Sequence, residues 1–566
     1  MKRTALASAL LLLVALSTLA QPTQNNEKTV AQLQAEMAAK KLNSVSLTNY
    51  YLTRIKILDQ KEGVNSVIEL NPDAMAMAKN ADELRSQGKV LGPLHGIPVL
   101  LKDNIDTGDK MQTTAGSFAL AGTPAVADST IAAKLRAGGA VILGKTNLSE
   151  WANFRSFFST SGWSGRGGLT HNPFSLDRNA CGSSSGSAAA VSANFTAVSI
   201  GTETDGSIVC PANVNSVVGI KPTVGLTSRA GVVPISHTQD TPGPHGRTVA
   251  DAAATLSVLA SRTPDPKDPA TSGVPLGWQG TGKTRPAIPP DYTAFLNPNG
   301  LNGARIGTTR QGIDNAPPQV GAAFDAAVAA IEAAGATVVD LDAANFSFDP
   351  ASGEFLVLVY DFKIDLQKYF ATRVGVPMAG KTLADAIAFN NANAATEMPY
   401  FFQEIFELAE SIDTSSPDAP QAAFGGLTYN QALLADHNAG VSLDAALAQF
   451  SLDAIVAPTD SPAWTTDLIL SDHFLFASSG LAGGPGYPIV QVPSGNVLGM
   501  PVGISFFGTA FSEPKLIRLA SGFEAATHAR IQPTFTGNIT TANTNGTTLS
   551  KKGSSKKPAG LNPHHM

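Results

Sequence analysis

Residues 182–207 read GSSSGSAAAVSANFTAVSIGTETDGS and contain two loops of serine and glycine on either side of an apolar segment. A Gly/Ser tract alone is typical of a flexible linker. Here residues 188–191 predict a helix of small residues and residues 197–200 predict a buried strand, so both loops are attached to the core. Upstream, an apolar run over residues 97–101 ends at Lys102.

The rest of the chain alternates predicted helices and strands. Helices are predicted within residues 28–59, 128–136 and 320–334, and strands over residues 140–143, 336–339, 454–457 and 488–492. This alternation favours the α/β class, with a large mixed central β-sheet covered by helices on both faces. Residues 263–300 are rich in Pro, Gly and Asp, which fits an interdomain linker or a long surface excursion, and we expect the excursion.

Residues 345–450 combine helical segments with a concentration of aromatic side chains. These side chains line a substrate pocket or pack in the core, and we expect core packing for any one of them. They include Phe355, Tyr360, Tyr369, Phe370, Tyr400, Phe401, Phe402 and Phe406.

The composition is that of a globular protein with a large core, because 43% of the 566 residues are hydrophobic and 15% are charged. The formal net charge is −6 and no basic patch is present, so a nucleic-acid partner has no electrostatic support. No Cys/His cluster has the spacing of a zinc site. We therefore expect no metal and no cofactor, and the sequence leaves the oligomeric state open.

The two ends of the chain differ from the rest. Lys2 and Arg3 precede an apolar run and a small-residue segment ending at Ala20, which predicts a signal peptide over residues 1–20. The alternative is an uncleaved anchor helix, although the apolar run is short for a bilayer. We expect export to the periplasm or the medium, and no stable membrane association after cleavage. Residues 21–27 are a polar leader, and residues 534–566 predict a disordered polar tail.

The two cysteines, Cys181 and Cys210, flank the serine loops. An oxidising compartment could bridge them if the loops meet. The alternative is a pair of small buried thiols, and this is what we expect.

Ser207 and Lys102 together can supply a nucleophile and its base. A serine hydroxyl needs an adjacent base, and the N–H groups of a tight turn can stabilise an oxyanion. Burial lowers the pKa of a lysine from about 10.4 towards about 7–8, where it can act as a base. On these residues alone, an ion pair between Lys102 and Asp103 or another carboxylate is the stronger interpretation.

Seven short motifs change this balance, because together they resemble the amidase signature family over residues 28–533. The motifs are residues 95–104, 144–147, 182–187, 201–207, 219–223, 240–244 and 499–503. The resemblance implies the amidase signature fold for this domain. It also implies a Ser–cis-Ser–Lys triad with Ser207 as nucleophile, Ser183 as the cis-serine and Lys102 as base. The backbone N–H groups of Thr204, Asp205, Gly206 and Ser207 would form the oxyanion hole.

Four positions depart from the common family pattern. Glu203 replaces an aspartate, Asp205 and Ser185 replace glycines, and Val209 replaces an arginine. With these residues the chain is similar to the bacterial peptide amidases, which release ammonia from the C-terminal carboxamide of peptides. The resemblance therefore implies a small-molecule or peptide amide as substrate, and a general aliphatic or aryl amidase is the alternative.

Other functions remain to be weighed. Residues 182–186 match G-x-S-x-G with Ser184 as nucleophile, but residues 176–180 do not predict the buried strand that this motif requires. An amidotransferase subunit belongs to the same family, but its partners are cytoplasmic whereas the leader predicts export. A catalytically inactive binding protein is disfavoured because Lys102, Ser183 and Ser207 are all present.

Overall fold

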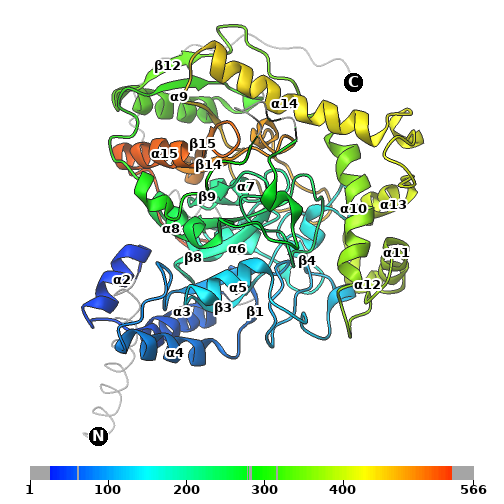
Figure 1. The fold of residues 1–566 in the computed structure, drawn as a ribbon, viewed down its shortest axis with the longest axis horizontal. Coiled ribbons are helices and arrows are strands. Elements are labelled where there is room, and N and C mark those ends of the chain that lie inside the picture. Colours follow the sequence, from blue (N-terminus) through cyan, green and yellow to red (C-terminus); the bar gives the residue numbers. More distant parts are fainter. Residues whose placement is uncertain (1–25, 60–62, 277, 279–283, 314–315, 538–566) are drawn as a thin grey trace, which may run out of the picture.

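The computed structural model describes residues 26–59, 63–276, 278, 284–313 and 316–537 (Figure 1). A mixed sheet of 11 strands runs through the described residues in the order β1-β3-β2-β8-β10-β9-β14-β15-β13-β11-β12. Helices cover both faces of this sheet, so the predicted fold class is confirmed. The predicted signal peptide, residues 21–25 of the predicted polar leader and residues 538–566 of the predicted tail lie outside the described residues.

The strands of the large sheet fall into parallel and antiparallel groups. In sheet order they are β1 (Val67–Leu70), β3 (Val141–Thr146), β2 (Pro98–Lys102), β8 (Val198–Glu203), β10 (Thr241–Gly246), β9 (Val218–Lys221), β14 (Ile489–Val497), β15 (Met500–Phe507), β13 (Ala454–Pro458), β11 (Arg305–Thr308) and β12 (Thr337–Asp340). Strand β2 is parallel to β3 and β8, and β11 is parallel to β12 and β13, whereas the other pairs are antiparallel. Two small sheets pair β4 (Trp163–Ser164) with β5 (Gly168–Leu169) and β6 (His171–Asn172) with β7 (Ser175–Asn179).

The helices form layers on the sheet and a separate group at one side of it. Those in contact with the sheet or with each other around it are α2 (Val30–Ala38), α3 (Ser44–Leu58), α4 (Ala74–Ser86), α5 (Thr130–Ala137), α6 (Ser185–Ser192), α7 (Val209–Val214), α8 (Val249–Leu259), α9 (Pro318–Ala333) and α15 (Glu513–Thr527). The side group is α10 (Glu354–Phe370), α11 (Leu383–Ala392), α12 (Ala394–Glu397) and α13 (Glu404–Ser411). Helix α14 (Tyr429–Gln449) joins this group to the sheet, because it contacts α10 and also shares a core cluster with β13, β14 and β15 (Figure 1). Among the described residues, no helix has the length and apolar character that a membrane crossing requires.

Strands β2 and β8 place the functional loops. Every residue of both strands is buried, as expected for parallel strands covered on both faces. Because the two strands are parallel neighbours, their carboxyl ends meet at the same edge of the sheet. Lys102 ends β2 and Glu203 ends β8, so the base candidate and the second serine loop leave the sheet side by side.

The predicted elements match the structure to within three residues at their ends, except that the strand predicted over residues 488–492 continues to Val497 in β14. The helical pattern over residues 28–59 is two helices, α2 and α3, each with a side-chain cap at its N-terminus. The described part of residues 263–300 is a surface excursion and not an interdomain linker, because it packs back onto the domain and buries Thr271 and Tyr292 there. Residues 534–536 hydrogen-bond to residues 173–176, so the start of the predicted tail contacts the domain.

Core packing accounts for most of the aromatic concentration. Tyr360, Tyr369 and Phe370 of α10 and Phe406 of α13 are buried in one core cluster, as predicted for individual residues. Phe402 is exposed instead. None of the eight aromatic residues named above lines the cavity that contains Ser207.

Candidate active site

Lys102 is fully buried at the end of β2. Its Nζ lies 2.7 Å from Oγ of Ser183 and donates to both oxygens of Thr202, at 3.2 Å to the carbonyl and 3.0 Å to the hydroxyl. Burial lowers the pKa of Lys102 to about 7, while the charges of Asp240 and Glu203 act in the opposite direction. The alternative of an ion pair with Asp103 is wrong, since Asp103 instead contacts Thr114 and the Arg166 guanidinium.

The first serine loop lies directly against the second. The peptide bond between Gly182 and Ser183 is cis. The N–H of Ser184 donates to the carbonyl of Ser207 at 3.1 Å. The Ser184 hydroxyl donates to the Thr202 carbonyl at 3.0 Å and accepts from the Thr202 N–H at 3.2 Å. The two loops are therefore joined by hydrogen bonds of the Ser184 backbone N–H and of the Ser184 hydroxyl.

Ser207 lies at a cavity of about 520 Å³ that opens to solvent. Among the described residues, its hydroxyl has no hydrogen-bond partner, and the contact between Ser183 and Lys102 is not extended to it. The N–H groups of Asp205, Gly206 and Ser207 also donate no hydrogen bond within the described part of the chain. The next two N–H groups, of Ile208 and Val209, are held by the Glu203 carboxylate at 2.6 and 3.0 Å.

The walls of the cavity combine apolar and polar side chains from distant segments. Apolar groups come from Phe154, Phe157, Ile235, Leu358, Ile405, Trp464 and Phe474. The Asp472 carboxylate joins two of these walls, because it accepts hydrogen bonds from Ser161 and from the Trp464 indole. A cavity of this size and mixture can hold an amide that carries an apolar side chain.

Cys181 and Cys210 form a disulfide bond, so the expectation of two free thiols is wrong. Both cysteines line the cavity. Cys181 precedes the cis peptide bond, and Cys210 lies three residues after Ser207, so the bridge links the two serine loops. The sequence could not settle this point, because the pairing depends on how closely the loops approach each other.

The G-x-S-x-G alternative does not fit the geometry. Residues 175–179 form a strand, β7, but its three central residues are only partly buried, so the expectation that the motif's buried strand is missing is confirmed. This strand pairs with β6 in a small sheet outside the central one. Ser184 is completely buried and does not line the cavity. It therefore lacks the access that a nucleophile needs.

Two residues of the site were not singled out by the sequence as functional. Thr202 holds the Lys102 amine, and Asp240 accepts the Thr204 hydroxyl at 2.6 Å. Burial raises the pKa of Asp240 to about 6 against the effect of its hydrogen bonds. Both residues lie inside the motifs named above: Asp240 is the first residue of 240–244 and Thr202 is the second of 201–207. Their polar side chains at these positions could have marked them as functional candidates.

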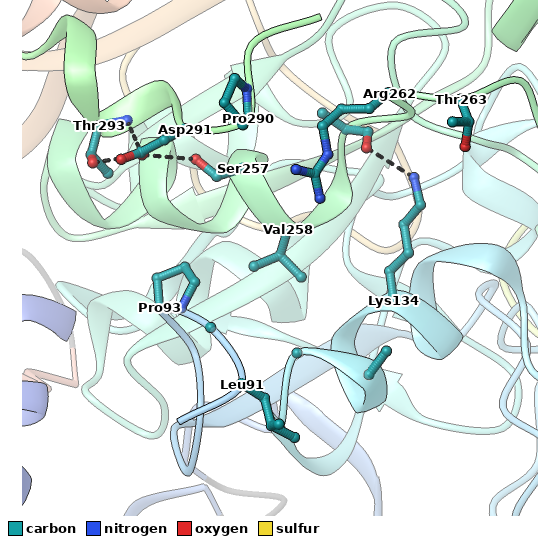
Figure 2. Close-up of a pocket in the computed structure, with 14 residues that line it drawn as sticks. Leu91, Pro93, Lys134, Ser257, Val258, Arg262, Thr263, Pro290, Asp291 and Thr293 are labelled. Carbon is teal, nitrogen blue, oxygen red and sulfur yellow. Dashed lines mark hydrogen bonds between the residues drawn. The ribbon is translucent and has the colours of Figure 1, made fainter. Parts of the chain in front are cut away.

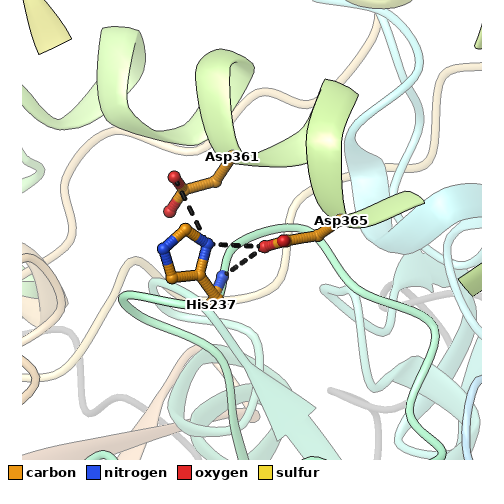
Figure 3. Close-up of side chains that lie close together, drawn as sticks. All are labelled: His237, Asp361 and Asp365. Atoms are coloured by element: carbon orange, nitrogen blue, oxygen red, sulfur yellow. Dashed lines mark hydrogen bonds and ion pairs between the residues drawn. The ribbon is translucent and has the colours of Figure 1, made fainter. Parts of the chain in front are cut away.

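Two other polar features lie apart from this site. A cavity of about 550 Å³ lies between α5 and α8 (Figure 2). Its Lys134 donates to the carbonyls of Leu259 and Ala260, at the C-terminal end of α8, which is a capping role. His237, Asp361 and Asp365 form a cluster with potential metal-ligand atoms within 4.8 Å of one another (Figure 3).

This cluster is already satisfied by hydrogen bonds. Nδ1 of His237 lies 2.7 Å from Asp365, and hydroxyl groups of Ser236 and Thr238 donate to Asp361. Burial lowers the pKa of His237, but the hydrogen bond to Asp365 and the charges of both aspartates raise it above its ordinary value overall. Hydrogen bonds among the residues of this segment and α10 therefore account for the cluster.

The fold and the site together define a hydrolase of the amidase class. The amidase family model matches residues 46–517, and the chain belongs to the amidase signature family. It is 45% identical to the peptide amidase of Stenotrophomonas maltophilia, with a TM-score of 0.81 over 90% of this chain and 99% of that one.

Two curated relatives extend the comparison. "Probable amidase At4g34880" of Arabidopsis thaliana is 41% identical over 522 residues, which cover 90% of this chain and 92% of the relative. A glutamyl-tRNA(Gln) amidotransferase subunit of Salinispora tropica is 33% identical over 88% of this chain and 96% of the relative. The similarity to the peptide amidase structure agrees with the predicted branch.

Proposed function

We propose that the protein hydrolyses the C-terminal carboxamide of peptides through an acyl-enzyme on Ser207, with Ser183 as proton relay and Lys102 as base. The observation that carries the proposal is the buried contact of 2.7 Å between Lys102 and Ser183, next to the cavity that contains Ser207. A charged lysine has three donors and no acceptor, whereas a neutral amine has two donors and one lone pair. In the proposed neutral form, the two oxygens of Thr202 accept the two N–H donors of Lys102, which leaves its lone pair to accept a proton from the Ser183 hydroxyl.

The chemistry follows from these positions. As Ser207 attacks the amide carbon, its proton passes to Ser183 while the proton of Ser183 passes to Lys102. The unoccupied N–H groups of the 204–207 turn stabilise the oxyanion. The C–N bond then breaks, and the relay returns the proton to the departing nitrogen, which leaves as ammonia. Water enters by the same route, its proton passes to the relay, and the acid is released from Ser207.

Two observations support a peptide amide as the substrate. The chain is 45% identical to a peptide amidase over nearly the whole of that enzyme. The cavity at Ser207 is also large enough for a bulky terminal residue and carries apolar walls for it. A general aliphatic or aryl amidase is the second candidate, because the proposed triad would serve any amide that enters the cavity.

Export belongs to the same proposal. Residues 1–20 have the composition of a signal peptide. The disulfide between Cys181 and Cys210 agrees with an oxidising compartment. Fractionation of cells that express the full chain tests this part. Recovery in the cytoplasm with the leader intact would overturn export and favour the amidotransferase alternative.

The activity is tested by measuring ammonia release from purified wild type and Ser207→Ala. The panel holds N-protected peptide amides, simple aliphatic and aryl amides, and glutamine. We expect release from peptide amides that Ser207→Ala abolishes, while Ser184→Ala retains measurable turnover because Ser184 lies outside the cavity. An inactive Ser184→Ala beside an active Ser207→Ala would overturn the assignment of the nucleophile. Release from simple amides alone would overturn the peptide substrate.

A further inference from the structure

Helix α10 is tied to the active site by the segment that precedes β10. His237 contacts Asp365 twice, through Nδ1 at 2.7 Å and through its backbone N–H at 2.9 Å (Figure 3). On either side of it, the hydroxyls of Ser236 and Thr238 donate to Asp361 at 2.6 and 2.9 Å. Asp361 and Asp365 are four residues apart and therefore lie on the same face of α10. Three consecutive residues are thus held to one face of the helix.

The same segment ends at Asp240, which reaches the catalytic loops. One carboxylate oxygen of Asp240 accepts the N–H groups of Ile235 and Ser236 at 2.8 and 3.0 Å. Its other oxygen accepts the Thr204 hydroxyl at 2.6 Å. Thr204 begins the turn that carries Ser207. The position of Asp240 is therefore set on one side by the His237 segment and on the other by this turn.

Asp240 also acts on Lys102 through its charge. After burial, Asp240 is the largest influence on the pKa of Lys102, and it raises that pKa. A displaced Asp240 would therefore change both the geometry of the Thr204 turn and the protonation of the base. An effect on protonation can be measured separately from an effect on folding.

We propose that His237 is a positioning residue for amide hydrolysis, because its contacts with Asp361 and Asp365 hold Asp240 against Thr204 and near Lys102. This inference rests on the function proposed above, in which Lys102 is the base. His237 itself does not contact the cavity at Ser207 and has no part in the chemical steps.

The charged and titratable groups around His237 come from several elements. They are Asp361 and Asp365 of α10, Lys368, which is 3.0 Å from Asp365, Arg229, whose guanidinium donates to the His237 carbonyl, and His437 of α14, which lines the same small cavity as His237. The two aspartates are the negative partners of the imidazole. A divalent metal is the rival occupant, but it would have to displace the proton that Nδ1 shares with Asp365.

The test compares the pH dependence of kcat/KM for wild type, His237→Ala, Asp240→Asn and the double variant. We expect His237→Ala to lower kcat/KM by about tenfold to a hundredfold, as small misplacements of a catalytic turn do. Its acid limb should move to lower pH by roughly 0.5 to 1 unit, because a carboxylate that stabilises charged Lys102 has moved away. Asp240→Asn should shift the limb in the same direction, and the double variant should shift no further.

Gln367→Ala is the matched control, because Gln367 is an exposed residue of the same helix. Its profile should equal that of wild type. A His237→Ala enzyme with a lower melting temperature and an unmoved acid limb would overturn the proposal, as would additive shifts in the double variant. If EDTA dialysis releases one tightly bound metal per chain and His237→Ala fails to bind it, the cluster is a metal site and the proposal is wrong.

Titration of Lys102 by ¹³C NMR of labelled lysine side chains makes the test independent of substrate. A lowered Lys102 pKa in His237→Ala supports the positioning role even if the wild type hydrolyses none of the amides in the panel. In that case the proposed substrate is wrong and the positioning inference stands. An unchanged Lys102 pKa overturns the inference whatever the activity.

Discussion

Replacing Lys102 with methionine should abolish hydrolysis and, at the same time, stabilise the protein near pH 7. With a pKa of about 7, half of Lys102 is neutral at pH 7, and a tenfold change in the neutral fraction follows each pH unit well below that value. The kcat/KM of the wild type should therefore rise about tenfold per unit up to about pH 6 and level off above about pH 8. The kcat/KM of Lys102→Met should fall about 10⁴-fold or more, since the members of the proposed triad would act as a unit.

The stability change follows from the same pKa. The pKa of Lys102 falls from 10.5 in the unfolded chain to about 7 in the folded protein. At 1.36 kcal/mol per pKa unit, this shift destabilises the folded state by about 4 kcal/mol at pH 7. Methionine removes that cost but leaves Thr202 and Ser183 without their partner, which costs about 1–3 kcal/mol. The variant should therefore be more stable than wild type by about 1–3 kcal/mol at pH 7.

The sign of the pH dependence provides a second check. Between pH 7 and 10.5 the unfolded chain binds more protons at this position than the folded chain, so the stability of the wild type rises with pH across that window. Lys102→Met should lose this contribution. Urea unfolding at a series of pH values measures both effects.

Lys145→Met is the control for a buried lysine outside the site. Lys145 is equally buried on the next strand, where it donates to Ile105 and Thr113. Its removal leaves the charge of Asp103 less compensated, so it should destabilise the protein without moving the acid limb. The reasoning is refuted if Lys102→Met retains a tenth of the activity with the wild-type acid limb, or if it is less stable than Lys145→Met.

Two further predictions concern the cavity and its disulfide. Replacing Cys181 and Cys210 by serine removes the covalent link between two residues that are 29 positions apart. Because the unfolded chain then gains loop entropy, the free energy of unfolding should fall by about 3.6 kcal/mol. Equal urea midpoints for the variant and the oxidised wild type would contradict this. Phe157→Ala should raise KM for peptide amides with an apolar last residue by about threefold to tenfold with little change in kcat, because half-exposed Phe157 lines the cavity. Leu434→Ala, at an exposed position of α14, is its control, and a parallel fall in kcat would argue against a binding role for Phe157.

Part of the sheet could be predicted from the sequence, because several of its strands are short apolar runs between clear breaks, whereas β10 reads TPGPHG and has no such pattern. Residues 97–101, 140–143 and 454–457 each carry the pattern of a buried strand, and each is one. The order of the strands is different, because it depends on pairing between segments that are far apart in the chain. Strand β9, for example, lies between β10 and β14.

The site shows the same division between local and distant information. The motifs identify Lys102, Ser183 and Ser207 as candidates, and their residue types alone indicate the chemistry. The contacts that set the properties of the site span long separations, such as 81 residues between Lys102 and Ser183 and 125 between Ser236 and Asp361. The disulfide and the His237 contacts depend on such approaches, so no local pattern in the sequence predicts them.

Two opposing effects set the strength of the proposed base. Burial alone would push the pKa of Lys102 further down, while Asp240 and Glu203 raise it back to about 7. A lysine with a much lower pKa would be neutral at every relevant pH but would accept a proton from Ser183 less readily. A lysine with its ordinary pKa would be a stronger base but almost entirely charged at neutral pH. The two carboxylates therefore do more than hold the loops in place. They keep the pKa of the Lys102 amine near neutral pH, where the amine combines a substantial neutral fraction with a useful proton affinity.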